Sequence, residues 1–199
     1  EYLKFLKKKL NVLEPRFLVA PYFYMSSQTF DDWLPLNLKF IEFAKESAKN
    51  SFSDDSIFAE IVIDKEILND DELCGDLLKK YTAVNPDGYL IWIDDFDTTQ
   101  VGKRLLGNFM DFVKGLTTQG NPVINLYGGY FSILLTKLKN GLTGMVHGPE
   151  YGESRSVVPV GGGIPTAKYY FPPLHKRMSY DEVAKILTNR NIFETNDVN

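Results

Sequence analysis

Near-continuous apolar runs alternate along this chain with segments whose apolar residues recur every three or four positions. This alternation predicts a series of strand–helix units. Near-continuous apolar runs occupy residues 17–25, 57–64, 88–94, 122–129 and 142–148. Short runs that are apolar on both faces are typical of strands in a parallel sheet that helices cover. The pattern therefore predicts five strands.

The segments between these runs have helical spacing. In residues 33–49 the apolar side chains recur every three or four positions, at Trp33, Leu36, Phe40 and Phe43. Further helices are predicted at residues 69–81, 102–116 and 130–140. A last helix is predicted at residues 179–190, because Ser179 and Glu182 have the spacing of a capping box.

Alternating strands and helices predict an α/β fold with a parallel sheet. We favour a TIM-barrel-like arrangement, because Glu60 lies within a strand and needs a polar interior or a partner. Five units are too few to close an eight-stranded ring. Residues 1–199 are therefore expected to form either a single α/β domain or the C-terminal part of a larger barrel, completed by a further domain or a partner chain. The alternative is an open doubly wound sheet.

The strand–helix rhythm ends after residue 148. Residues 149–178 are rich in glycine and proline, and a long segment of this kind in a compact domain is commonly a binding loop. We expect it to lie over the C-terminal ends of the strands.

Composition narrows the classes of function. The chain has 199 residues, 44% of them hydrophobic, a net charge of -4 and one cysteine. One cysteine excludes an intramolecular disulfide and a cysteine metal cluster, which favours a cytoplasmic protein. No apolar run reaches the about 20 residues that cross a bilayer, so no membrane association is expected. Net acidity argues against non-specific nucleic acid binding.

Ionisable side chains collect where the predicted strands end. The candidate catalytic residues are Asp64, Asp94, Asp95, His147, Glu150 and Glu153. Parallel sheets place their active sites at this edge, and a histidine near carboxylates suits proton transfer. The alternative for Asp64 is that it caps the following helix.

Three carboxylates within four residues, Asp94, Asp95 and Asp97, repel one another unless a cation, a basic side chain or a shared proton intervenes. Their oxygen atoms suit Mg or Mn as a cofactor. A solvated acidic loop is the alternative.

Several other residues are candidates for binding an anion or a substrate. Glycines between a strand and a helix leave backbone N–H groups free for an anion, and arginine binds oxyanions directly. The candidates are Tyr127, Gly128, Gly129, Arg155, Gly161, Gly162, Gly163 and His175. The alternatives are tight turns for the glycines and a solvated surface position for His175.

These residues predict an enzyme, a hydrolase or a glycosyl transferase, that uses carboxylate and histidine acid–base chemistry on a sugar- or phosphate-bearing small molecule or a nucleotide-type ligand. One alternative is a nucleoside- or nucleic-acid-modifying enzyme of the transglycosylase or nuclease type. In it, bases would stack on Tyr127, Tyr130, Tyr169 and Tyr170, and phosphate would meet Arg155, His175, Lys176 and Arg177. Another is a non-catalytic partner-binding domain. Motifs for zinc proteases, P-loops and dinucleotide binding are absent from the sequence.

Overall fold

The computed structural model describes residues 16–51, 56–147, 155–157, 168–171 and 176–188. Its main feature is a parallel sheet of five strands in the order β1-β2-β3-β4-β5. The strands are β1 (Phe17–Val19), β2 (Ser56–Ile63), β3 (Gly88–Ile93), β4 (Val123–Asn125) and β5 (Gly144–Met145). The predicted α/β class with a parallel sheet is confirmed.

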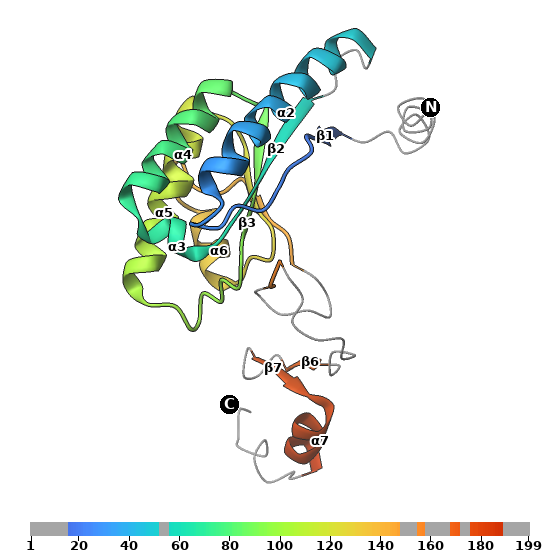
Figure 1. The fold of residues 1–199 in the computed structure, drawn as a ribbon. Helices are drawn as coiled ribbons and strands as arrows, with labels where there is room; N and C mark the ends of the chain where they lie inside the picture. The colour runs from blue at the N-terminus through green and yellow to red at the C-terminus, as the bar shows by residue number, and fades with distance from the viewer. Residues whose placement is uncertain (1–15, 52–55, 148–154, 158–167, 172–175, 189–199) are drawn as a thin grey trace.

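Helices connect successive strands and lie together on one side of the sheet (Figure 1). They are α2 (Phe30–Ser51), α3 (Lys65–Asn69), α4 (Asp71–Val84), α5 (Lys103–Leu116) and α6 (Tyr130–Leu135). Crossover connections between parallel strands are right-handed, so strands added in one direction carry all their helices on the same face. A doubly wound sheet would reverse this order, and the described strands show no reversal. Among them β1 pairs only with β2 and β5 only with β4, so closure into a barrel is not seen.

The two faces of the sheet have different surroundings. Alternate residues of β2 and β3, including Ile61 and Ile91, belong to the main hydrophobic core against the helices. The intervening residues point to the opposite face, and Glu60 and Trp92 are two of them. On that face the Phe58 ring stacks on Phe17 with 4.2 Å between ring centroids. It also covers Gly88, where a Cβ atom would overlap it.

The predicted boundaries needed correction at several strands. The first run, residues 17–25, forms a regular strand only over Phe17–Val19, and Met25 returns to the sheet through a single bridge to Ile63. Pro21 lies in the gap and lacks a backbone N–H for the ladder. The fourth and fifth runs likewise shorten to three and two residues.

The predicted helix at residues 69–81 is part of a pair. The chain turns at Asp70, whose side chain accepts the backbone N–H groups of Glu72 and Leu73 and caps α4. A separate short helix, α3, begins directly after β2. The aspartate-rich sequence thus supplies two helix starts, at Asp64 and at Asp70.

The C-terminal part holds a hairpin that the sequence did not predict. Strands β6 (Lys168–Phe171) and β7 (Lys176–Ser179) pair antiparallel within the segment interpreted as a loop. Helix α7 (Tyr180–Thr188) contacts both strands. The predicted capping box is confirmed, because the Ser179 N–H and hydroxyl both donate to the Glu182 carboxylate. In the described part of the chain, none of the helices has the length and apolarity needed to span a membrane.

Candidate functional site

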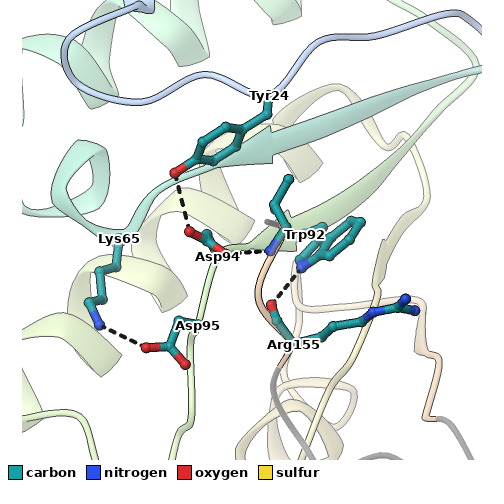
Figure 2. A network of polar contacts seen from close by, with 7 residues as sticks. Tyr24, Lys65, Trp92, Asp94, Asp95 and Arg155 are labelled. Atoms are coloured by element: carbon teal, nitrogen blue, oxygen red, sulfur yellow. Dashed lines mark hydrogen bonds and ion pairs between the residues drawn. The ribbon is translucent and has the colours of Figure 1, made fainter. Parts of the chain in front are cut away.

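Asp94 joins three segments at the C-terminal end of β3. Its Oδ1 accepts the backbone N–H of Val157 at 2.6 Å, and its Oδ2 accepts the Tyr24 hydroxyl at 3.2 Å (Figure 2). Burial and the nearby carboxylates of Asp94 and Asp64 raise the pKa of Tyr24. Its phenol therefore remains a donor to Asp94 throughout the neutral range.

The 155–157 segment lies across the end of β3. The Arg155 carbonyl oxygen accepts two hydrogen bonds, from the Trp92 Nε1–H at 3.1 Å and from the Asp95 backbone N–H at 3.2 Å. Asp95 has a positive φ of 47°, a conformation that aspartate tolerates better than most residues. The sheet end and the segment are thus connected through both main-chain and side-chain groups.

The Arg155 side chain lies beside two aromatic rings. Its guanidinium carbon is 5.9 Å from the Trp92 ring centroid and 5.4 Å from that of Tyr127. One of its nitrogens also donates to the Tyr127 hydroxyl at 2.9 Å. The two rings are tilted against each other with centroids 4.9 Å apart. A cation over two rings, with solvent on its other side, can receive an anionic or planar ligand.

The other acidic side chains of this loop have separate partners. Asp95 forms an exposed ion pair with Lys65 at 3.6 Å, and the Asp97 carboxylate accepts the N–H and the hydroxyl of Thr99. In the described residues, no three or more His, Cys, Asp or Glu side chains are grouped so that they could hold a metal ion. Asp94, Asp95 and Asp97 therefore have different partners at this strand end.

Asp64 has the capping geometry that the sequence analysis gave as an alternative. Its Oδ1 accepts the Ile67 N–H at the start of α3, and its Oδ2 accepts the Ser27 N–H, both at 3.0 Å. The carboxylate thus fixes the β1–α2 connection beside the end of β2. Its hydrogen bonds give Asp64 a structural role at this edge.

The turn after β4 is closely packed. The Gly128 N–H donates to the Val146 carbonyl oxygen at 3.0 Å. This bond joins the turn after β4 to the end of β5. A Cβ atom on Gly128 would lie 2.9 Å from the Ser132 Cβ and 3.0 Å from the Met145 Cβ. Gly129 caps α6, which has six residues. Close packing therefore explains Gly128 without an anion.

His147 follows β5 and is half-buried at the same edge of the sheet. The predictions for Glu150, Glu153, Gly161, Gly162, Gly163 and His175 lie outside the described residues. Tyr169, Tyr170, Lys176 and Arg177, which the nucleic acid alternative needs, lie on β6 and β7.

Sequence reasoning noticed Glu60 only as a fold signal, although it has the most distinctive environment of the described carboxyl groups. Its residue is 8% exposed, on the sheet face opposite the helices. Burial raises the pKa of Glu60, and a hydrogen bond from Tyr22 opposes that rise in part. Burial and the nearby Glu60 raise the pKa of Tyr22 to about 12. A glutamate inside an apolar strand was the signal that could have identified it.

The strand register places Glu60 near the aromatic pair Trp92 and Tyr127. Glu60 pairs with Leu90, and Val62 pairs with Trp92, so Glu60 and Trp92 lie on neighbouring strands two residues apart in register. That offset is about 7 Å along the strands. Besides burial, the charges of Glu60 and, to a smaller extent, Tyr127 contribute to the raised pKa of Tyr22.

Comparisons of this chain with protein-family models, with curated proteins and with solved structures found no match.

Proposed function

We propose that this protein is an enzyme that applies carboxyl acid–base chemistry to a sugar- or phosphate-bearing substrate at the C-terminal ends of its parallel strands. The observation that carries the proposal is the placement of Glu60 on the same sheet face as Trp92, with the Arg155 guanidinium over the ring of Trp92. The one-directional strand order supports a TIM-barrel-like architecture, in which this face is the barrel interior.

Glu60 is the proposed proton donor. A carboxyl group whose pKa is raised by burial keeps its proton closer to neutral pH, as a general acid requires. The neighbouring Tyr22 hydroxyl offsets part of the rise in the pKa of Glu60. Because Tyr22 is partly exposed and Glu60 is buried, the pair connects a buried acid with solvent-accessible surface.

Arg155, Trp92 and Tyr127 form the proposed binding part. A guanidinium offers a planar set of donors that matches phosphate or carboxylate oxygens. The two rings supply flat apolar surface for the body of the ligand. His147, at the end of β5, is the candidate for a second proton-transfer group at this edge.

The test measures turnover of a panel of 4-nitrophenyl glycosides and 4-nitrophenyl phosphate by wild type, Glu60→Gln and Glu42→Gln. Glu42 is an exposed residue of α2 and serves as the control. We expect Glu60→Gln to lose about 10²- to 10⁴-fold in rate, with Glu42→Gln unchanged. Full activity in Glu60→Gln, or no turnover of any probe by the wild type, would refute the proposal.

A nucleotide is the second candidate ligand, because arginine over paired aromatic rings also suits a stacked base beside a phosphate. The net charge of -4 favours a single nucleotide over a polyanion. Titration of Trp92 fluorescence with adenosine, guanosine and cytidine monophosphates in a Trp33→Phe background distinguishes the two candidates. Saturable quenching by one nucleotide, without quenching by sugar phosphates, would favour a nucleotide as the ligand.

A further inference from the structure

We propose that Asp94 is a positioning residue, which holds the 155–157 segment across the end of β3 and so keeps the Arg155 guanidinium over Trp92 and Tyr127. Sequence reasoning placed Asp94 among the catalytic carboxylates. We call the hold of Asp94 on the 155–157 segment the clamp. The ligand-binding role of Arg155 rests on the proposed function, whereas the clamp itself is a property of the fold.

The hydrogen bonds of Asp94 support a holding role. One carboxylate oxygen is bound by Val157 and the other by Tyr24, at 2.6 and 3.2 Å. Tyr24 precedes α2. Asp94 therefore links the segment before α2 and the 155–157 segment to the end of β3. With an N–H or O–H donor on each oxygen, the carboxylate is oriented toward the protein chain.

The clamp acts on Arg155 through the backbone. Asp94 holds the N–H of Val157, and two residues earlier the Arg155 carbonyl oxygen is held by Trp92 and Asp95. The segment is therefore fixed at both ends of a three-residue stretch (Figure 2). A fixed backbone limits the positions open to the Arg155 side chain, which reaches Tyr127 at 2.9 Å. Preorganisation of this kind lowers the entropic cost of binding a ligand.

Hydrogen exchange of the Trp92 indole N–H tests the clamp without any substrate. This group donates to the Arg155 carbonyl oxygen rather than to Asp94, so its protection reports whether the 155–157 segment is docked. In a Trp33→Phe background Trp92 is the one remaining tryptophan, and its indole signal is identified directly by NMR. We expect Asp94→Ala to increase indole exchange about tenfold, because the lost bonds involve a charged acceptor.

Two further variants locate the effect. Asp94→Asn should restore most of the protection, since its amide oxygen still accepts the Val157 N–H. Val157→Pro removes the backbone N–H that Asp94 accepts, because proline has none. It should increase indole exchange as Asp94→Ala does. It also keeps the test valid if Asp94→Ala fails to fold. Asp97→Ala is the control, because its carboxylate binds Thr99 in the same loop, and exchange should be unchanged.

Indole exchange equal to wild type in both Asp94→Ala and Val157→Pro would overturn the proposal. With a turnover assay in hand, Asp94→Ala should raise KM as Arg155→Ala does and leave most of kcat, whereas a large loss of kcat at unchanged KM would assign Asp94 to catalysis instead. Failure of every substrate probe would refute the proposed function and leave the exchange result to decide the clamp.

Discussion

The Asp94 carboxylate accepts the backbone N–H of Val157 at 2.6 Å, although the two residues are 63 positions apart in the sequence. This contact joins the end of β3 to a segment that follows the whole described sheet. It brings Arg155 to Trp92 and Tyr127, two residues that come from neighbouring strand ends. Together with Glu60 and Tyr22 on the same side of the sheet, these groups define the candidate site.

Replacing Glu60 by glutamine should change how stability depends on pH. Because the native pKa of Glu60 is raised, the folded state holds this proton more tightly than the unfolded state, whose pKa is about 4.3. The stabilising contribution of the proton is full below that value and is lost as pH rises through the native pKa. We therefore expect the free energy of unfolding of Glu60→Gln, relative to wild type, to increase between pH 4 and pH 7.

Urea unfolding followed by far-UV circular dichroism at several pH values measures this difference. Glu42→Gln, which changes an exposed carboxyl group on α2, controls for the loss of one charge. A constant difference between Glu60→Gln and wild type across the range would contradict a raised pKa.

Removing the Tyr24 hydroxyl should weaken the Asp94 network. Tyr24→Phe deletes one hydrogen bond to a partly buried carboxylate and is expected to cost about 1 kcal/mol in unfolding free energy. In an Asp94→Ala background the same change should cost much less, because the acceptor has gone. Chemical unfolding of the four proteins gives the coupling energy, and additive losses would show that the bond contributes nothing.

Gly128→Ala should destabilise the fold through crowding. The new Cβ would lie 2.9 Å from the Ser132 Cβ and 3.0 Å from the Met145 Cβ, and overpacking of this kind costs about 1–3 kcal/mol. The matched change Gly75→Ala lies inside α4, where nothing beyond the two chain neighbours and the helix's own backbone lies within 4 Å of the added methyl. It should stabilise by up to about 1 kcal/mol. Thermal unfolding midpoints that move in the same direction for both variants would contradict the packing explanation.

Asp64→Ala should destabilise by about 1–2 kcal/mol, because it removes the cap of α3 and the acceptor for the Ser27 N–H. Asp64→Asn keeps an amide oxygen for the Ile67 N–H and should recover part of the loss. A catalytic role would show the opposite pattern, with Asp64→Asn inactive at wild-type stability. Unfolding and turnover measured on the same preparations separate the two roles.

Local signals allowed several parts of this structure to be predicted. Helix starts were recognisable because aspartate and serine side chains accept nearby backbone N–H groups, as at Asp70 and Ser179. Strand boundaries were less predictable: the apolar run at residues 17–25 forms a short strand, because Pro21 interrupts it and only Met25 rejoins the sheet. The β6–β7 hairpin was missed, since its strands lie among glycines and prolines typical of loops.

The sequence by itself determined the parallel α/β class, the sheet edge where polar residues gather and the candidate status of Asp94, Tyr127 and Arg155. These follow from local periodicity and from the geometry of parallel strands. Only the tertiary structure decided that Asp64 caps a helix, that Asp95 and Asp97 have separate partners, and that Glu60 is a buried acid beside Tyr22. The reason is physical: a carboxyl group takes its role from the donors, charges and solvent around it, and distant parts of the chain supply these only after folding.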